Sequence, residues 1–220
     1  MHNVQKSSGY AALIQAAAFI LSPINFVLLL PSLGIDPTAL PDPAAYLPVL
    51  NSPLLYVGSL IQFVLAGTVV LIALALHEGA ANGESLGGRW AVAAAITGST
   101  LLLITALLNV VALRVLGSAP AADQAAILLT AKVVGDALLA AAFVAVGWSF
   151  VLTGWAALQQ ANLPRGLALL MLVGGAAAIL TFVLPQLRPL TALFNLVWST
   201  WLGAKFLRAP IAGRAALATS

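Results

Sequence analysis

The chain has 220 residues, of which 62% are hydrophobic and only 7% charged, and its formal net charge is +3. Soluble domains carry about 25% charged residues, because a surface in contact with water must be polar. Nine basic and six acidic side chains are too few to cover a soluble globule of this size. Disorder is excluded as well, since disordered chains are poor in apolar residues. The composition predicts an all-α bundle of transmembrane helices.

The content of cysteine and histidine limits the possible chemistry further. The chain contains no cysteine, which excludes disulfides, thiolate nucleophiles and cysteine metal sites. Its two histidines, His2 and His77, lie outside the apolar segments, so we expect no haem, zinc or other cofactor between the helices. We also expect no nucleic-acid partner, because basic residues beside apolar segments are typical orientation signals at a membrane.

Six segments are long and apolar enough to cross a bilayer, which takes about 20 residues. They cover residues 10–30, 54–76, 90–115, 124–158, 166–184 and 190–207. We therefore expect one domain over residues 1–220, a polytopic bundle of six spanning helices. The first segment can also be read as a signal peptide with Lys6 as its charged flank, in which case five spans would remain.

The longest connection and the basic residues predict how the bundle is oriented. Residues 31–53 contain six prolines, which are unfavourable inside helices, so we expect a long loop that forms a lid over one end. With six spans, one side carries Lys6, Arg89, Arg165, Lys205, Arg208 and Arg214, and the other carries Arg114, Lys132 and Arg188. This excess of basic residues predicts cytoplasmic N- and C-termini in the inner (plasma) membrane.

The fourth segment contains two charged residues, Lys132 and Asp136. They are four residues apart, so they share a helical face and can pair. Ionisable groups at membrane depth usually have a function, such as an ion or proton pathway. Alternatively both lie at the outer interface, where lysine reaches water, and residues 125–134 form an amphipathic ramp along the surface.

Uncharged polar residues occur within several of the other segments. Gln15 and Asn25 lie on the first, Gln62 on the second, Asn109 on the third and Asn195 on the sixth. Such residues can line a polar cavity, or they can form hydrogen bonds between helices that contribute about 1 kcal/mol each. Both interpretations stay open.

Motifs for catalysis are incomplete. The sequence HEGAA at residues 77–81 lacks the second histidine of a zinc metalloprotease motif. Aspartyl proteolysis needs two carboxylates, and Asp136 is the one carboxylate near membrane depth. We therefore assign no catalytic residue and expect a protein that is not an enzyme, although a lipid-modifying activity stays open.

Four sequence features resemble those of an uncharacterised bacterial six-helix membrane family, domain of unknown function four-three-eight-six. They are SGYAAL at residues 8–13, GW at 147–148 in a long fourth helix, LPRGL at 163–167, and GG at 174–175. The resemblance covers nearly the whole chain in length and layout. It implies a six-helix membrane fold, and it implies no activity and no catalytic residues.

These observations lead to three hypotheses about function. The first is a non-catalytic accessory or structural subunit of a membrane assembly, with membrane lipids, partner subunits or further copies of the chain as its partners. The second is a small transporter or channel with a polar path near Gln15, Asn109 and Asp136. The third, a lipid-handling enzyme, depends only on the lid-like loop.

Overall fold

The computed structural model describes residues 2–78, 86–160 and 163–208, and within these ranges every regular element is helical. This confirms the all-α prediction. Arg214, residues 79–81 of the HEGAA segment and residues 161–162 of the fourth connection lie outside the described residues. The elements in chain order are α1 (His2–Ile24), η1 (Asn25–Leu29), α2 (Leu30–Ser32), α3 (Pro43–Tyr46), η2 (Leu47–Val49), η3 (Pro53–Tyr56), α4 (Val57–Glu78), α5 (Leu86–Leu116), α6 (Ala121–Gln160), α7 (Arg165–Leu180), η4 (Pro185–Leu187) and α8 (Arg188–Arg208).

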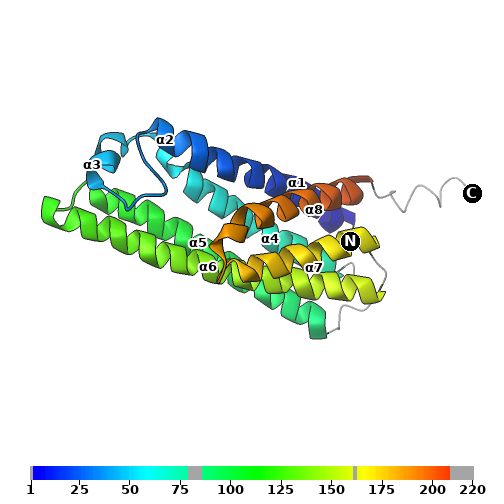
Figure 1. Ribbon diagram of the computed structural model, residues 1–220. Coiled ribbons are helices and arrows are strands. Elements are labelled where there is room, and N and C mark those ends of the chain that lie inside the picture. The colour runs from blue at the N-terminus through cyan, green and yellow to red at the C-terminus, as the bar shows by residue number, and fades with distance from the viewer. Residues whose placement is uncertain (1, 79–85, 161–162, 209–220) are drawn as a thin grey trace, which may run out of the picture.

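Six of the described helices form a closed ring in chain order. α1 packs against α4, then α4, α5, α6, α7 and α8 each pack against the next, and α8 packs back against α1 (Figure 1). Neighbours in the ring run in opposite directions. We call the end at which α1 begins and α8 ends the terminal end, and the opposite end, which carries α3, the cap end.

Four helices are long and apolar enough to cross a membrane. They cover Lys6–Ser32, Pro53–Glu78, Gly87–Leu116 and Ala121–Gln160. The protein is therefore a membrane-embedded helical bundle. The first of these helices packs between α4 and α8, which makes it part of the folded ring and favours a membrane helix over a signal peptide.

The prediction of six spanning helices is met only in part, because the last two helices fall outside these four. α7 has 16 residues, a length of about 24 Å at 1.5 Å per residue. It ends at Leu180, before residue 184, with Thr181 at its C-terminal cap, and a turn leads from there to the proline at position 185. α8 has 21 residues, but polar side chains such as Thr191 and Asn195 interrupt its apolar sequence.

α7 and α8 form a hairpin along only part of α6. α6 is one continuous helix of 40 residues, about 60 Å long, and it runs straight in Figure 1. Residues 125–134 therefore belong to this rod rather than to a separate surface ramp. Beyond the hairpin turn, the ring continues toward the cap end as α1 with η1 and α2, α4, α5 and α6 (Figure 1).

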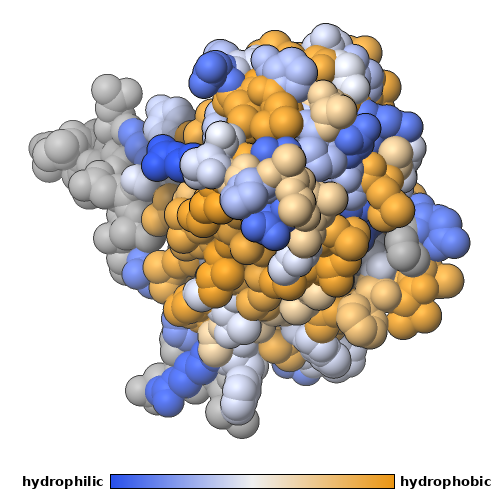
Figure 2. All heavy atoms as spheres, turned by 90° about the vertical axis from the view of Figure 1, so that its left-hand side faces the viewer, coloured by the Kyte–Doolittle hydropathy of each residue, from blue (hydrophilic) through white to orange (hydrophobic). Residues whose placement is uncertain are grey.

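The segment between α2 and α4 closes the cap end. It contains the short helices α3, η2 and η3, where the sequence predicts only a loop, and Asp42 caps α3 by accepting from the amide of Ala44 at 2.9 Å. Ile35 and Leu55 from this segment are buried against Leu113 of α5. Figure 2 shows this end as a mixture of apolar (orange) and polar (blue) residues, and Leu40 is 77% exposed.

Glycines bring three pairs of helices into backbone contact. A Cβ atom added at Gly147 of α6 would lie 2.6 Å from the carbonyl oxygen of Gly175 on α7. At Gly98 of α5 it would lie 2.6 Å from Val146 of α6, and at Gly203 of α8 it would lie 2.8 Å from Leu13 of α1. Small residues of this kind permit close helix packing in membranes, so they set the register of the ring.

Candidate functional site: a buried polar cluster in the helix ring

The interior of the ring contains polar side chains that are all uncharged. Among the described residues, the buried polar side chains are Ser8, Gln15, Asn25, Ser59, Thr68, Ser99, Thr105, Ser149, Thr181, Thr191, Asn195 and Ser199. Several threonine hydroxyls donate to carbonyls of their own helix, as Thr105 does to Leu101 at 2.8 Å. These hydroxyls are satisfied locally and need no further ligand.

Gln15 on α1 is different because its amide has no partner. The side chain is 0% exposed, and neither Nε2 nor Oε1 has a hydrogen-bond partner within the described part of the chain. A primary amide offers two donors and one acceptor oxygen. Leaving these groups unpaired in an apolar interior costs several kcal/mol, about 4–8 kcal/mol relative to water on a cyclohexane scale.

Two serine hydroxyls are also buried without a hydrogen-bond partner among the described residues. Ser199 of α8 is 0% exposed and Ser99 of α5 is 4% exposed, and the Oγ atom of each is unpaired among the described residues. We call Gln15, Ser99 and Ser199 the core polar cluster. They come from three helices of the ring.

Helix register places Gln15 and Ser199 within about one helical turn of the same level. Gly203 of α8 lies against Leu13 of the antiparallel α1, so Ser199, one turn before Gly203, lies about half a turn beyond Gln15. On the other side of α1, the Ser8 hydroxyl donates to the carbonyl of Leu71 at 3.2 Å. Two turns along α1, Gln15 therefore lies opposite the middle of α4.

A satisfied polar chain borders the cluster on α8. The indole Nε1 of Trp198 donates to Oδ1 of Asn195 at 2.8 Å, and Nδ2 of Asn195 donates to the carbonyl of Thr191 at 2.8 Å. The Trp198 ring is 0% exposed and meets Phe150 edge to face, with 4.7 Å between ring centroids. These contacts fix Asn195 and Trp198 as structural groups beside the cluster.

The other uncharged residues singled out in the sequence lie closer to the cap end. Asn25 is 9% exposed and lies against Gly58. Within the described ranges, neither Oδ1 of Asn25 nor Oε1 of Gln62 has a hydrogen-bond partner. Asn109 is half-buried and faces Gly135 of α6. Asn25 and Asn109 are more than one helical turn from Gln15 and Ser99 along α1 and α5. Gln62 lies within about one turn of the level of Gln15, because Ser8 of α1 meets Leu71 of the antiparallel α4.

Lys132 and Asp136 do pair, and they lie on the outer surface of α6. Lys132 Nζ is 3.3 Å from Asp136 Oδ2, with 37% of the lysine and 53% of the aspartate side chain exposed. An exposed pair with this spacing contributes about 0.3–0.5 kcal/mol to helix stability. The arrangement does not bring Asp136 into the interior with Gln15.

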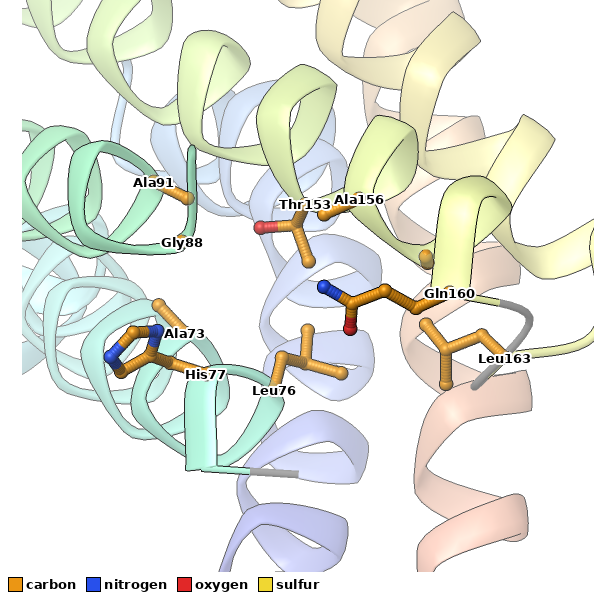
Figure 3. A pocket seen from close by; sticks show the side chains of 10 residues that line it. Ala73, Leu76, His77, Gly88, Ala91, Thr153, Ala156, Gln160 and Leu163 are labelled. Atoms are coloured by element: carbon orange, nitrogen blue, oxygen red, sulfur yellow. The ribbon is translucent and has the colours of Figure 1, made fainter. Parts of the chain in front are cut away.

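A pocket at the terminal end was not predicted from the sequence. It has a cavity volume of about 30 Å³, and it lies between α4, α5 and α6 with His77, Thr153 and Gln160 among its lining residues. Figure 3 shows Gln160 extending from α6 into this space, with His77 on the α4 side. His77 belongs to the last turn of α4, and its Nδ1 is shielded from solvent with no partner among the residues described.

A helical signal in the sequence identifies His77 in retrospect. Ala66, Val69 and Ala73 follow one buried face of α4 at intervals of three and four residues. The same spacing continues to His77. His77 follows the apolar run and so lies outside the segment predicted from the sequence, but α4 and its buried face extend one turn further.

The fold and the site together define a class of protein, a membrane-embedded helical ring with an uncharged polar interior. Comparisons with protein-family models, with curated proteins and with solved structures found no match. The resemblance to the domain-of-unknown-function family therefore stays a prediction.

Proposed function

We propose that the protein is a six-helix membrane protein that binds small neutral polar solutes at the core polar cluster and allows them to cross the membrane. The observation that carries this proposal is Gln15, whose amide is fully buried and unpaired within the described residues. A solute or water molecule with both donors and acceptors would satisfy this amide and the hydroxyls of Ser99 and Ser199.

The charge of the interior favours a neutral solute over an ion. Every buried polar side chain in the described ranges is uncharged, and an unpaired ion in such a site would carry a large desolvation cost. The charged pair Lys132–Asp136 is exposed, so it supports no ion pathway through the ring. Urea, glycerol and water have the size and chemistry that this site would accept.

Placing α7 and α8 in the membrane, so that six helices are embedded, is also part of the proposal. The outward side chains of α7, including Leu169 and Val173, and of α8, including Leu193 and Val197, are apolar and exposed. Basic residues gather at the terminal end: Lys6, Arg89, Arg165, Lys205 and Arg208. Positive charges favour the cytoplasmic side, which supports cytoplasmic termini and a location in the plasma membrane.

Permeation through proteoliposomes tests the proposed function. Vesicles with the wild-type protein are expected to take up urea or glycerol, or to pass water, faster than protein-free vesicles when stopped-flow light scattering follows their volume. Gln15→Leu should lose this increase, whereas Thr200→Val, on the exposed face of α8, should keep it. Wild-type vesicles that match protein-free vesicles for all three probes would refute the proposal.

The stability of Gln15→Leu provides a second readout. Replacing an unpaired buried amide with an apolar side chain of similar size is neutral or stabilising, by about 1 kcal/mol. We expect Gln15→Leu to unfold in detergent at the same or a higher temperature than the wild type. A variant that both unfolds early and loses permeation would indicate a structural hydrogen bond at Gln15 instead.

A second candidate function, an accessory subunit of a membrane assembly, is favoured by Trp148. This residue lies on α6 two turns from Trp155, and the two side chains are 50% and 59% exposed. Lipid-facing tryptophans concentrate at the membrane interface, whereas Trp148 lies about 10 Å deeper than Trp155. A photo-crosslinking residue at position 148 would trap a partner helix in native membranes, and capture of lipid alone would exclude an assembly at this face.

A further inference from the structure

The pocket at the terminal end borders the buried apolar core of the bundle. Ala73 on α4 lines the pocket and also belongs to the buried core that contains Val69, Ala95 and Phe150. Val69 is one turn inward from Ala73 on α4. Ala95 is one turn inward from the pocket residue Ala91 on α5.

One helical turn inward from the pocket, α4, α5 and α6 each contribute a buried apolar side chain to a larger core that also contains Ile72 and Leu202. Val69, Ala95 and Phe150 come from α4, α5 and α6 and are 4%, 0% and 4% exposed. Ser99 of the core polar cluster is one turn beyond Ala95 on the same face of α5. Apolar layers of this kind control permeation because water leaves a narrow apolar passage readily.

The pocket itself has groups that can bind a neutral polar molecule. Nδ1 of His77 is unpaired among the described residues, and Gln160 contributes an amide from the opposite wall. The hydroxyl of Thr153, on the same wall, donates to the carbonyl of Ser149 at 2.7 Å and keeps acceptor capacity. A volume of about 30 Å³ has room for about one or two water-sized molecules.

We infer that the His77 pocket is the entrance through which a small neutral polar solute reaches the core polar cluster from the terminal end, past the layer of Val69, Ala95 and Phe150. This inference rests on the proposed function and adds the route and its direction. His77 and Gln160 bind the solute outside the apolar layer, and Gln15 with the two serines binds it inside.

The natural absence of cysteine permits a direct test with single-cysteine variants. Ala156→Cys places a thiol on the pocket wall, and Arg165→Cys places one on the exposed surface at the same end. A charged, membrane-impermeant thiol reagent is applied to one face of the vesicles at a time. Urea permeation is then measured before and after modification.

We expect Ala156→Cys to be modified only from the face that carries the terminal end, with urea permeation falling to the rate of protein-free vesicles. Arg165→Cys should be modified from the same face with permeation unchanged. Modification of Ala156→Cys only from the other face, no modification except after unfolding, or modification that leaves permeation unchanged would each overturn the entrance while the proposed function stands. Wild-type vesicles without permeation would overturn the proposed function and the entrance together.

A second variant tests the apolar layer. Phe150→Ala removes the largest side chain of the layer and should raise the rate of urea permeation, provided that the purified variant keeps wild-type helicity. Ala95→Leu adds volume at the same layer and should lower the rate. A folded Phe150→Ala variant with an unchanged or lower rate would show that the route does not pass this layer.

Discussion

Buried polar side chains in this ring fall into two groups that the residue type alone does not distinguish. The hydroxyls of Thr68 and Thr105 donate to carbonyls within their own helices, which is the usual way for threonine to satisfy itself in a membrane helix. Gln15 and Ser199 have no such partner within the described residues. Only the second group has unused donors, and these are the groups that a bound solute would satisfy.

The hydrogen bond between Trp198 and Asn195 gives a prediction about stability. Asn195→Ala removes the acceptor of a fully buried indole N–H and should lower the free energy of unfolding by about 1–3 kcal/mol. In a Trp198→Phe background, which has no N–H to satisfy, the same substitution should cost less. Thermal unfolding of the four proteins in detergent measures the difference, and equal costs in both backgrounds would contradict a role for this bond.

Asp36, at the cap end, gives a prediction about pH. The hydroxyl of Thr38 donates to Asp36 Oδ1 at 2.7 Å, and the amide of Thr38 donates to the same oxygen at 2.8 Å. These bonds favour the carboxylate and lower the pKa of Asp36 below 3.8. The stabilisation is present above pH 3.8 and is lost as the pH falls through the lower, folded-state value.

Thr38→Val removes the hydroxyl bond, so it should raise the pKa of Asp36 toward 3.8. Titration of the Asp36 carboxyl carbon by NMR measures this value. Thr130→Val, an exposed threonine of α6, serves as the control and should leave the titration of Asp36 unchanged. If Thr38→Val leaves the pKa of Asp36 unchanged, the hydroxyl of Thr38 is not the cause of the lowered pKa.

At the scale of helices, glycine contacts decide which neighbours approach most closely. Gly147 of α6 and Gly175 of α7 face each other, and a Cβ on either would lie 2.6 Å from the carbonyl oxygen of the other. No side-chain rotation can relieve a clash with backbone. The absence of side chains at Gly147 and Gly175 therefore allows the short helix α7 to pack closely against α6.

A matched pair of glycine substitutions tests this contact. Gly147→Ala should lower the free energy of unfolding by about 1–3 kcal/mol, the usual cost of overpacking. Gly67→Ala on α4, where an added Cβ would meet no atom within 4 Å, should be neutral or stabilise the helix by about 0.5–1 kcal/mol. Equal unfolding temperatures for the two variants would show that α6 and α7 are not in backbone contact.

For the molecule as a whole, the proposed topology places the terminal end and the cap end on opposite sides of the membrane. Ser7 lies exposed on the first turns of α1, and Ser118 lies exposed in the turn between α5 and α6 at the cap end. In whole cells, Ser118→Cys should react with an impermeant thiol reagent, and Ser7→Cys should react only after the cells are permeabilised. The reverse pattern would invert the proposed orientation, and labelling of both residues from outside would exclude an odd number of spans between Ser7 and Ser118, such as the three formed by α1, α4 and α5.

Sequence reasoning predicted those parts of the fold that depend on one helix at a time. The apolar runs of α4, α5 and α6 and the pairing of Lys132 with Asp136 follow from composition and helical spacing, and the structure confirms both. The segment at residues 166–184 was predicted too long, because apolar residues continue past Leu180 although the helix does not. Apolarity indicates contact with lipid, but it does not fix where a helix ends.

The candidate site was predictable only in part for a related reason. Gln15 could be identified as a polar residue in an apolar segment, but its alignment with Ser199 depends on contacts such as Gly203 against Leu13, which join residues almost two hundred positions apart. His77 could not be identified from apolarity alone, because it lies just beyond the apolar run although it belongs to the same helix. Register between distant helices and the exact end of a helix are tertiary properties that local sequence patterns do not determine.

The short length of α7 has a consequence for the lipids around the protein. At about 24 Å, α7 is shorter than the roughly 30 Å hydrocarbon core of an average bilayer, while α6 beside it is much longer. In the proposed arrangement with α7 in the membrane, the exposed Phe182, Val183 and Leu184 at its end would contact acyl chains, and the leaflet would thin locally on this flank. Such hydrophobic mismatch would make the fold more stable in bilayers of shorter acyl chains and draw the protein toward thinner regions of its membrane.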